Sequence, residues 1–275
     1  MSTILAMSVA GSPGVTTTAL ALTLSWPQSV MLIEADTSRY SSVLPGYFRG
    51  QVAHARGIGE LPVASNNSGS LDINQVWAQT ISLVEETNDG PERRLVPGFR
   101  DPAIARAMDP VWGHLGTAAS SFEGMGMDVI FDAGRWNTND SRSSILRICD
   151  GVIIVARPTL PDIVALHKRL PTIRTELAVG GREDNITLLL VEQPSGPQLS
   201  SAEIRKAVGI QRTERLAWDD KTASIFSHGE PGMKRFEKTK YGRTLLPAIE
   251  TIRTQLAEQR SRLDQNRDKE RDARR

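Results

Sequence analysis

The sequence predicts an α/β fold in which a mostly parallel, twisted sheet carries helices on both faces. Its apolar runs are continuous rather than alternating, which is typical of strands that are buried on both faces. Helix-like segments separate these runs, and parallel strands need such crossover connections. With 275 residues, 39% of them hydrophobic, the chain is also long enough to bury a full core.

The first strand-helix-strand unit lies at the amino terminus. Residues 3–10 form a short apolar run that predicts a buried strand, and a turn rich in glycine and proline follows it. Residues 16–24 predict a helix, because hydroxyl residues precede an Ala/Leu run of high helical propensity. Residues 30–33 predict a second strand, which ends in Glu34-Ala35-Asp36.

Strands and helices continue to alternate along the rest of the chain. Further strands are predicted at residues 95–97, 128–132, 151–155 and 186–191. Helices are predicted near residues 102–121, 161–177, 201–208 and 243–256. We therefore expect residues 1–256 to form one domain.

Two stretches depart from this pattern. Residues 49–90 are predicted to be an irregular, surface-exposed insertion, with a helix possible at residues 73–84. Residues 257–275 form a mixed-charge tail with little to bury, which predicts frayed helix or disorder.

Charge and cysteine content exclude several classes of protein. The chain has 33 basic and 32 acidic residues, so no global field would draw it onto nucleic acid or an anionic membrane. The tail has no apolar face with which to anchor a membrane. The chain has one cysteine, Cys149, so no internal disulfide can form. No apolar run reaches the length of about 18 residues that a membrane-spanning helix needs. We expect a cytoplasmic protein that contacts other proteins.

The turn after the first strand is the strongest candidate site. Glycine-rich turns between a strand and a helix hold phosphates, because free N–H groups and the helix dipole converge there. Against the P-loop pattern G-x-x-x-x-G-K-[ST], Gly11 and Thr18 match, while Thr16 replaces the glycine and Thr17 replaces the lysine. The alternative is a tight connection that binds nothing, with Thr16 and Thr17 capping the helix.

Several segments together resemble the ParA/MinD family of deviant Walker ATPases. The second strand ends much like the D-x-D of the family, and residues 127–134 resemble its Walker B strand and switch region. Residues 149–155 and 216–220 resemble the strand that follows and the nucleotide-base loop. The family loop K-G-G-x-G-K-T-[TS] falls on Ser12-Pro13-Gly14-Val15-Thr16-Thr17-Thr18-Ala19.

The resemblance implies a P-loop NTPase fold of the SIMIBI type and a nucleotide, ATP or ADP with Mg²⁺. It implies that Thr18 and Asp132 hold the metal and that Asp36 orients the attacking water. Both family lysines are replaced, by Ser12 and Thr17, and Glu192-Gln193 stands where the family has an adenine-reading asparagine. The residues implied to bind the nucleotide are Gly11, Ser12, Pro13, Gly14, Val15, Thr16, Thr17 and Thr18.

The resemblance implies a protein of the partition or cell-positioning type that regulates a larger assembly, as a homodimer or with protein partners. Without a phosphate-facing lysine, hydrolysis should suffer more than binding. One alternative is a pseudo-ATPase that acts only as an interaction module, and another is a P-loop transferase or synthetase. Asp36 and Asp132 could instead be loop-capping residues, and Arg135 could partly replace a missing lysine.

Overall fold

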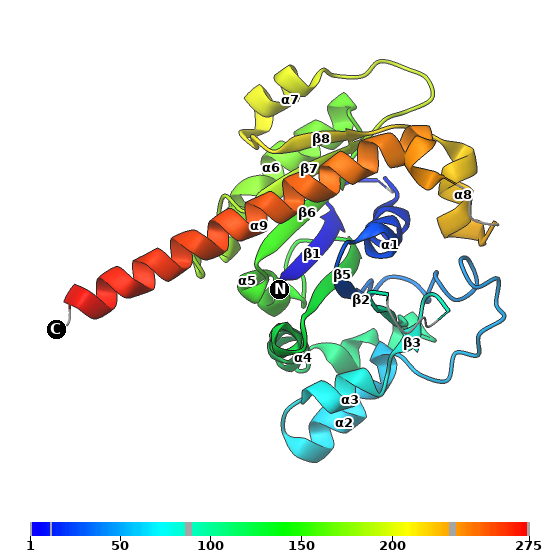
Figure 1. The fold of residues 1–275 in the computed structure, drawn as a ribbon, viewed down its shortest axis with the longest axis vertical. Coiled ribbons are helices and arrows are strands. Elements are labelled where there is room, and N and C mark those ends of the chain that lie inside the picture. Colours follow the sequence, from blue (N-terminus) through cyan, green and yellow to red (C-terminus); the bar gives the residue numbers. More distant parts are fainter. Residues whose placement is uncertain (1, 12, 86–89, 231–234, 274–275) are drawn as a thin grey trace.

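The computed structural model describes residues 2–11, 13–85, 90–230 and 235–273. The described residues form an eight-stranded sheet in the order β3-β4-β2-β5-β1-β6-β7-β8 (Figure 1). All neighbouring strands in it are parallel except the β3–β4 pair. The strands are β1 (Thr3–Ser8), β2 (Ser29–Glu34), β3 (Ile81–Ser82), β4 (Arg93–Val96), β5 (Met127–Arg135), β6 (Gly151–Ala156), β7 (Ile186–Val191) and β8 (Thr213–Leu216).

Helices cover both faces of the sheet, which confirms the predicted fold class. One face packs against α1, α8 and α9, and the other packs mainly against α4, α5, α6 and α7. The α-helices are α1 (Val15–Ser25), α2 (Leu61–Ser68), α3 (Ile73–Trp77), α4 (Trp112–Ser121), α5 (Ser143–Ile148), α6 (Leu160–Ala178), α7 (Ser201–Val208), α8 (Asp220–His228) and α9 (Lys240–Ala273). The 3₁₀ helices are η1 (Ile58–Glu60), η2 (Pro102–Met108), η3 (Phe122–Met125) and η4 (Phe236–Lys238).

The strand register brings the candidate site to one edge of the sheet. β1 lies between β5 and β6, and β2 lies on the other side of β5. Glu34 at the end of β2 is in register with Asp132 of β5. The turns that follow β1, β2, β5 and β6 therefore emerge at the same edge, which is where open α/β sheets bind ligands.

The segment at residues 49–90 differs from its prediction. It contains η1, α2, α3 and β3, and Ile58, Leu61 and Val76 are buried in the core. Apolar residues are sparse in this segment, so no sequence periodicity indicated the burial. Among its described residues the segment is therefore not wholly irregular and is partly buried, although many of its side chains are exposed, and α3 lies within the helix considered possible at residues 73–84.

The predicted helices also differ in extent. The single helix predicted at residues 102–121 is divided into η2 and α4, and the short helices α5 and α8 had no predicted counterpart. α9 continues to Ala273 and extends away from the sheet; of the two forms expected for the tail, frayed helix or disorder, the described part is helical (Figure 1). Charged residues such as Glu, Lys and Arg are good helix formers, which favours this extension. Among the described residues, no helix combines the length and apolarity needed to cross a membrane.

Candidate functional site

The turn between β1 and α1 leaves the amino-terminal end of the helix open. Gly11 (φ 55°) and Gly14 (φ 87°) both have left-handed backbone conformations, which glycine adopts without strain. Gly14 is the N-cap of α1, and no side chain caps this end. The Thr18 N–H donates to the Gly14 carbonyl at 2.9 Å, so the three N–H groups before it have no partner within the helix. Thr16 lies within the first turn and is not its cap.

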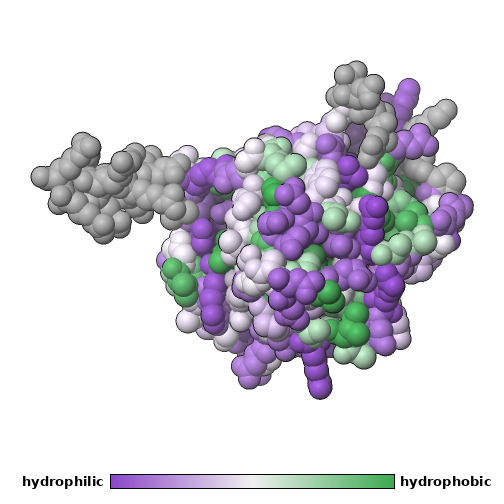
Figure 2. Space-filling model, turned by 90° about the horizontal axis from the view of Figure 1, so that it is seen from below, coloured by the Kyte–Doolittle hydropathy of each residue, from purple (hydrophilic) through white to green (hydrophobic). Residues whose placement is uncertain are grey.

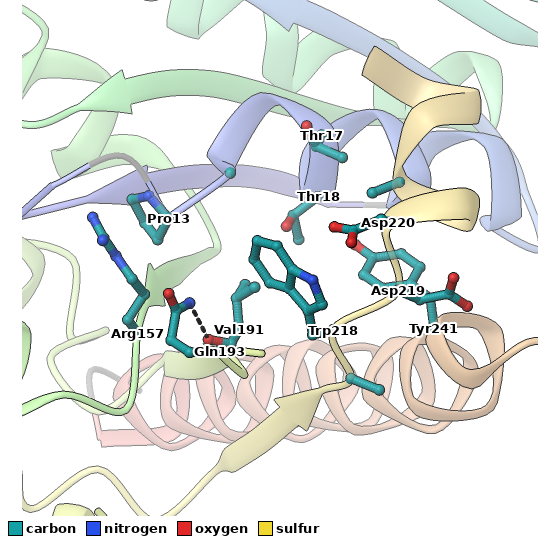
Figure 3. A pocket seen from close by; sticks show the side chains of 13 residues that line it. Pro13, Thr17, Thr18, Arg157, Val191, Gln193, Trp218, Asp219, Asp220 and Tyr241 are labelled. Carbon is teal, nitrogen blue, oxygen red and sulfur yellow. Dashed lines mark hydrogen bonds between the residues drawn. The ribbon is translucent and has the colours of Figure 1, made fainter. Parts of the chain in front are cut away.

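This end of α1 opens onto a cavity of about 260 Å³ (Figure 3). The cavity is slightly smaller than the range of about 300–1,000 Å³ that is usual for small-molecule sites. Its wall includes Pro13, Gly14, Thr17 and Thr18 from the predicted loop, and it continues to α9 and the segment that joins β8 to α8. Half of the predicted nucleotide-binding residues therefore line one cavity.

The other predicted loop residues lie elsewhere. Val15 is buried in the hydrophobic core that α1 shares with the sheet. The Thr16 side chain is directed at Asp132. Gly11 is exposed in the turn, next to the guanidinium of Arg157. Ser12 lies outside the described residues.

Two aromatic side chains form much of the cavity opposite the loop. Figure 3 shows Trp218 between the Arg157 side and the Tyr241 side of the cavity. Trp218 is 40% exposed, so a flat surface is accessible to a ligand. Burial raises the pKa of Tyr241 to about 12, although the nearby Thr18 hydroxyl opposes the shift. Tyr241 Oη is buried without a partner at hydrogen-bonding geometry.

The end of β7 does not present an asparagine to the cavity. Gln193 lines it, but its Nε2 donates to the carbonyl groups of Val191 (3.3 Å) and Glu192 (3.1 Å). The Glu192 carboxylate pairs with Arg215 at 3.1 Å. The Gln193 Nε2 group and the Glu192 carboxylate are therefore occupied by local contacts.

A buried carboxyl group lies behind the loop, at the end of β5. Asp132 is 1% exposed and accepts a hydrogen bond from the Gly134 N–H at 3.0 Å. Burial raises its pKa to about 7; the Thr16 hydroxyl opposes the shift, and the Glu34 and Asp36 carboxylates add to it. Asp132 therefore exchanges a proton near neutral pH.

Asp36 makes the contacts expected of a loop-capping residue. Its carboxylate accepts from the Ser38 N–H at 2.9 Å and from the Ser38 hydroxyl at 2.6 Å. Nε of Arg39 lies 3.5 Å from it. A Cβ added at Gly134 would collide with this carboxylate, so the loops after β2 and β5 are in close contact. The structure thus brings Asp36 close to the end of β5, outside the 260 Å³ cavity.

The two residues predicted to hold Mg²⁺ do not face each other. Thr18 lines the cavity near Tyr241, whereas Thr16 is directed at Asp132. Residues two apart on an α-helix point about 200° apart, so Thr18 cannot share the direction of Thr16. Within the described ranges, no group of three or more His, Cys, Asp or Glu side chains could hold a metal ion. The hydroxyl that the structure directs at Asp132 is therefore that of Thr16, not that of Thr18.

A buried arginine that the sequence did not single out positions the loops of this edge. Arg142 is fully buried and pairs with Asp140 at 2.6 Å. Its guanidinium also donates to the carbonyls of Ala35 (2.8 Å), Arg135 (3.0 Å) and Ala133. Trp136 covers it, with the guanidinium carbon 5.0 Å from the ring centre. Arg142 thus ties the loop after β2 to the end of β5.

The basic side chain at the cavity is not the expected one. Arg135 is exposed and does not line the cavity. Arg157, directly after β6, lines it beside Pro13 (Figure 3). The sequence did not indicate this placement, because an arginine that follows a strand is an ordinary loop residue and does not mark a site.

A parallel sheet whose central strand leads through a glycine turn into an uncapped helix is an arrangement that phosphate-binding α/β folds share. No model of a known protein family and no curated protein sequence matches the chain.

Solved structures do match the chain. MinD, a cell division ATPase from Pyrococcus furiosus, superposes with a TM-score of 0.70 and 14% identity, over 92% of this chain and 98% of MinD. A ParA family ATPase from Chlorobium tepidum TLS gives 0.67 and 15%, over 90% and 98%. McdA from Cyanothece, solved as a variant in complex with ATP, gives 0.66 and 17%, over 94% and 96%. This chain therefore has the fold of the ParA/MinD-type ATPases.

Proposed function

We propose that this protein is a ParA/MinD-like regulator that binds ATP or ADP weakly at the start of α1 and hydrolyses ATP slowly or not at all. One observation carries the proposal. The uncapped end of an 11-residue helix opens onto a cavity, and a hydroxyl, Thr17, lines that cavity where the family has its lysine.

The chemistry of this end favours binding over hydrolysis. Free N–H groups and the helix dipole stabilise a phosphate without any basic side chain. A missing ammonium removes a charge-assisted hydrogen bond of about 1.5–3 kcal/mol from binding, and more from a transition state in which charge develops. Thr18 lines the cavity and is not directed at Asp132, which supports the proposal that hydrolysis is slow or absent.

We further propose that the protein acts on a larger assembly through protein contacts, as a homodimer or with other partners, in the cytoplasm. Without the tail from Glu258, the body has a net charge of −1, which gives no support for a broad DNA-binding face. On the face seen in Figure 2, apolar residues form small patches among polar ones, which suits contacts of moderate area. We expect no direct membrane anchor.

Calorimetric titration tests the binding half of the proposal. ATP and ADP are titrated separately into the full chain, with and without Mg²⁺. We expect saturable, weak binding of both nucleotides and little gain from Mg²⁺. Absence of binding at millimolar nucleotide would refute the proposal.

A second candidate is a pseudo-ATPase that binds no nucleotide and acts only through protein interfaces. The separation of Thr18 from Asp132 favours it, as does the occupation of Gln193 by local contacts. Ligands that bind the native state raise its melting temperature. If millimolar ATP leaves the melting temperature unchanged, this candidate replaces the first.

A further inference from the structure

Arg157 is held at the mouth of the cavity by its own chain segment. Its backbone N–H donates to Asp162 Oδ2 at 3.1 Å, and its Nε lies 3.4 Å from the same oxygen. Asp162 is buried in the first turn of α6, so this ion pair keeps the inner end of the guanidinium beside that helix, and Nε has no partner at hydrogen-bonding geometry. The side chain is 33% exposed, which leaves its outer nitrogens accessible.

The turn before α1 leaves room for this side chain. A Cβ added at Gly11 would collide with Nη2 of Arg157, so the guanidinium occupies the space that any other residue at position 11 would fill. This close approach brings a cation from β6 to the turn that leads to the uncapped end of α1. The two positive features, the helix N-terminus and the guanidinium, lie at the same end of the cavity (Figure 3).

The charges around the cavity are divided between its two ends. Arg157 is the one basic side chain among its described lining residues, and Asp219 and Asp220 are the acidic ones. Asp219 caps α8, where it accepts from the Thr222 N–H (3.2 Å) and hydroxyl (2.7 Å). An anionic group is therefore attracted to the Arg157 end and repelled from the Asp219 end.

The cavity wall also holds a buried hydroxyl, that of Tyr241, with the Thr18 hydroxyl nearby. Tyr241 is 5% exposed and lines the cavity, and its Oη has no partner at hydrogen-bonding geometry. Buried polar atoms are generally paired with protein, water or ligand. A ligand with a hydrogen-bonding group could therefore be held at this wall by the Tyr241 hydroxyl, beside Thr18.

We propose that Arg157 is the phosphate-contacting cation of this site and that it supplies, from the β6–α6 connection, the charge that the loop at residues 11–18 lacks. The ligand class is a nucleoside di- or triphosphate whose phosphates lie between Arg157 and the start of α1. This inference rests on the proposed function. A guanidinium presents several N–H donors in one plane, which suits a phosphate.

The test is titration of ADP, and separately of inorganic pyrophosphate, into wild type, Arg157→Gln, Arg157→Lys and Arg135→Gln at low salt. Arg135→Gln is the matched control, because it removes an exposed arginine outside the cavity. We expect Arg157→Gln to weaken both affinities at least about tenfold, as loss of a charge-assisted hydrogen bond does. Arg157→Lys should recover part of the loss, and the control should bind like wild type.

A second measurement needs no variant. An arginine-directed dicarbonyl reagent is applied to wild type with and without ADP, and modified peptides are quantified by mass spectrometry. ADP should protect Arg157 and leave Arg135 reactive. This result does not depend on whether Arg157→Gln folds.

The outcomes separate this inference from the proposed function. Equal ADP affinity in wild type and Arg157→Gln, or no protection of Arg157, would overturn the inference and leave the proposed function standing. No binding of ATP or ADP by the wild type would overturn the proposed function, and the inference with it.

Discussion

The raised pKa of Asp132 makes a prediction about stability that needs no ligand. The group has a pKa of about 7 in the folded chain and 3.8 as a free side chain. Below pH 3.8 Asp132 is protonated in both the folded and the unfolded chain, so it does not change the free energy of unfolding. As pH rises towards 7, the unfolded chain ionises while the folded chain keeps its proton, so stability falls. Above pH 7 the loss is complete.

The magnitude follows from the same numbers. Each pKa unit corresponds to about 1.4 kcal/mol, so about two units between pH 5 and pH 7 amount to about 3 kcal/mol of lost stability. Asp132→Asn keeps an oxygen that can accept from the Gly134 N–H and cannot ionise. Between pH 5 and pH 8 we therefore expect the free energy of unfolding of Asp132→Asn to rise by about 3 kcal/mol relative to that of wild type.

The assay is urea denaturation of both proteins at pH 5 and pH 8, with Asp140→Asn as the control. Burial raises the pKa of Asp140, but the hydrogen bond and charge of Arg142 outweigh it and lower the pKa overall. Asp140 is thus ionised in both states at pH 5 and pH 8, and its variant should lose the same stability at each. If the difference in the free energy of unfolding between Asp132→Asn and wild type is the same at pH 5 and pH 8, the reasoning is refuted.

Three further predictions concern the loops of the site. Thr17→Lys should strengthen ADP binding by about ten- to a hundredfold, whereas Thr117→Lys, the same change at an exposed position of α4, should not; calorimetry decides. Arg142→Met should lower the free energy of unfolding, measured in urea, by about 3–5 kcal/mol, because Asp140 stays buried without its partner; a loss below about 1 kcal/mol would contradict the role of Arg142 in tying the loop after β2 to the end of β5. Gly134→Ala should destabilise the fold more than Gly50→Ala: both have positive φ, but only at position 134 would the new Cβ overlap a carboxylate. Equal melting temperatures would exclude that overlap.

The fold could be predicted from the sequence because it depends on patterns that a sequence displays. β7 has the bounds that its apolar run predicts, and the strands 128–132 and 151–155 lie within β5 and β6. The burial of Ile58 and Val76 could not be predicted, because isolated apolar residues in a polar segment show no period. α9 buries an apolar stripe as far as Leu256, and its extension from there to Ala273 follows from helical propensity.

The site was predictable only in part. The turn at residues 11–18 was indicated by its glycines and its place after the first strand, and four of its residues line the cavity. The directions of Thr16 and Thr18 depend on where the helix begins, which the sequence left open. Arg142 and Arg157 owe their positions to contacts with carbonyls and carboxylates from distant segments, for which one sequence carries no signal.

The most direct test of the central claim measures ATP binding and phosphate release in one sample of the full chain, with Mg²⁺ present. The account predicts saturable, weak binding with no release of phosphate above the protein-free background. Absence of binding would contradict the account. Rapid release that Asp36→Ala abolishes would contradict it as well, because Asp36 would then act in an assembled hydrolytic centre.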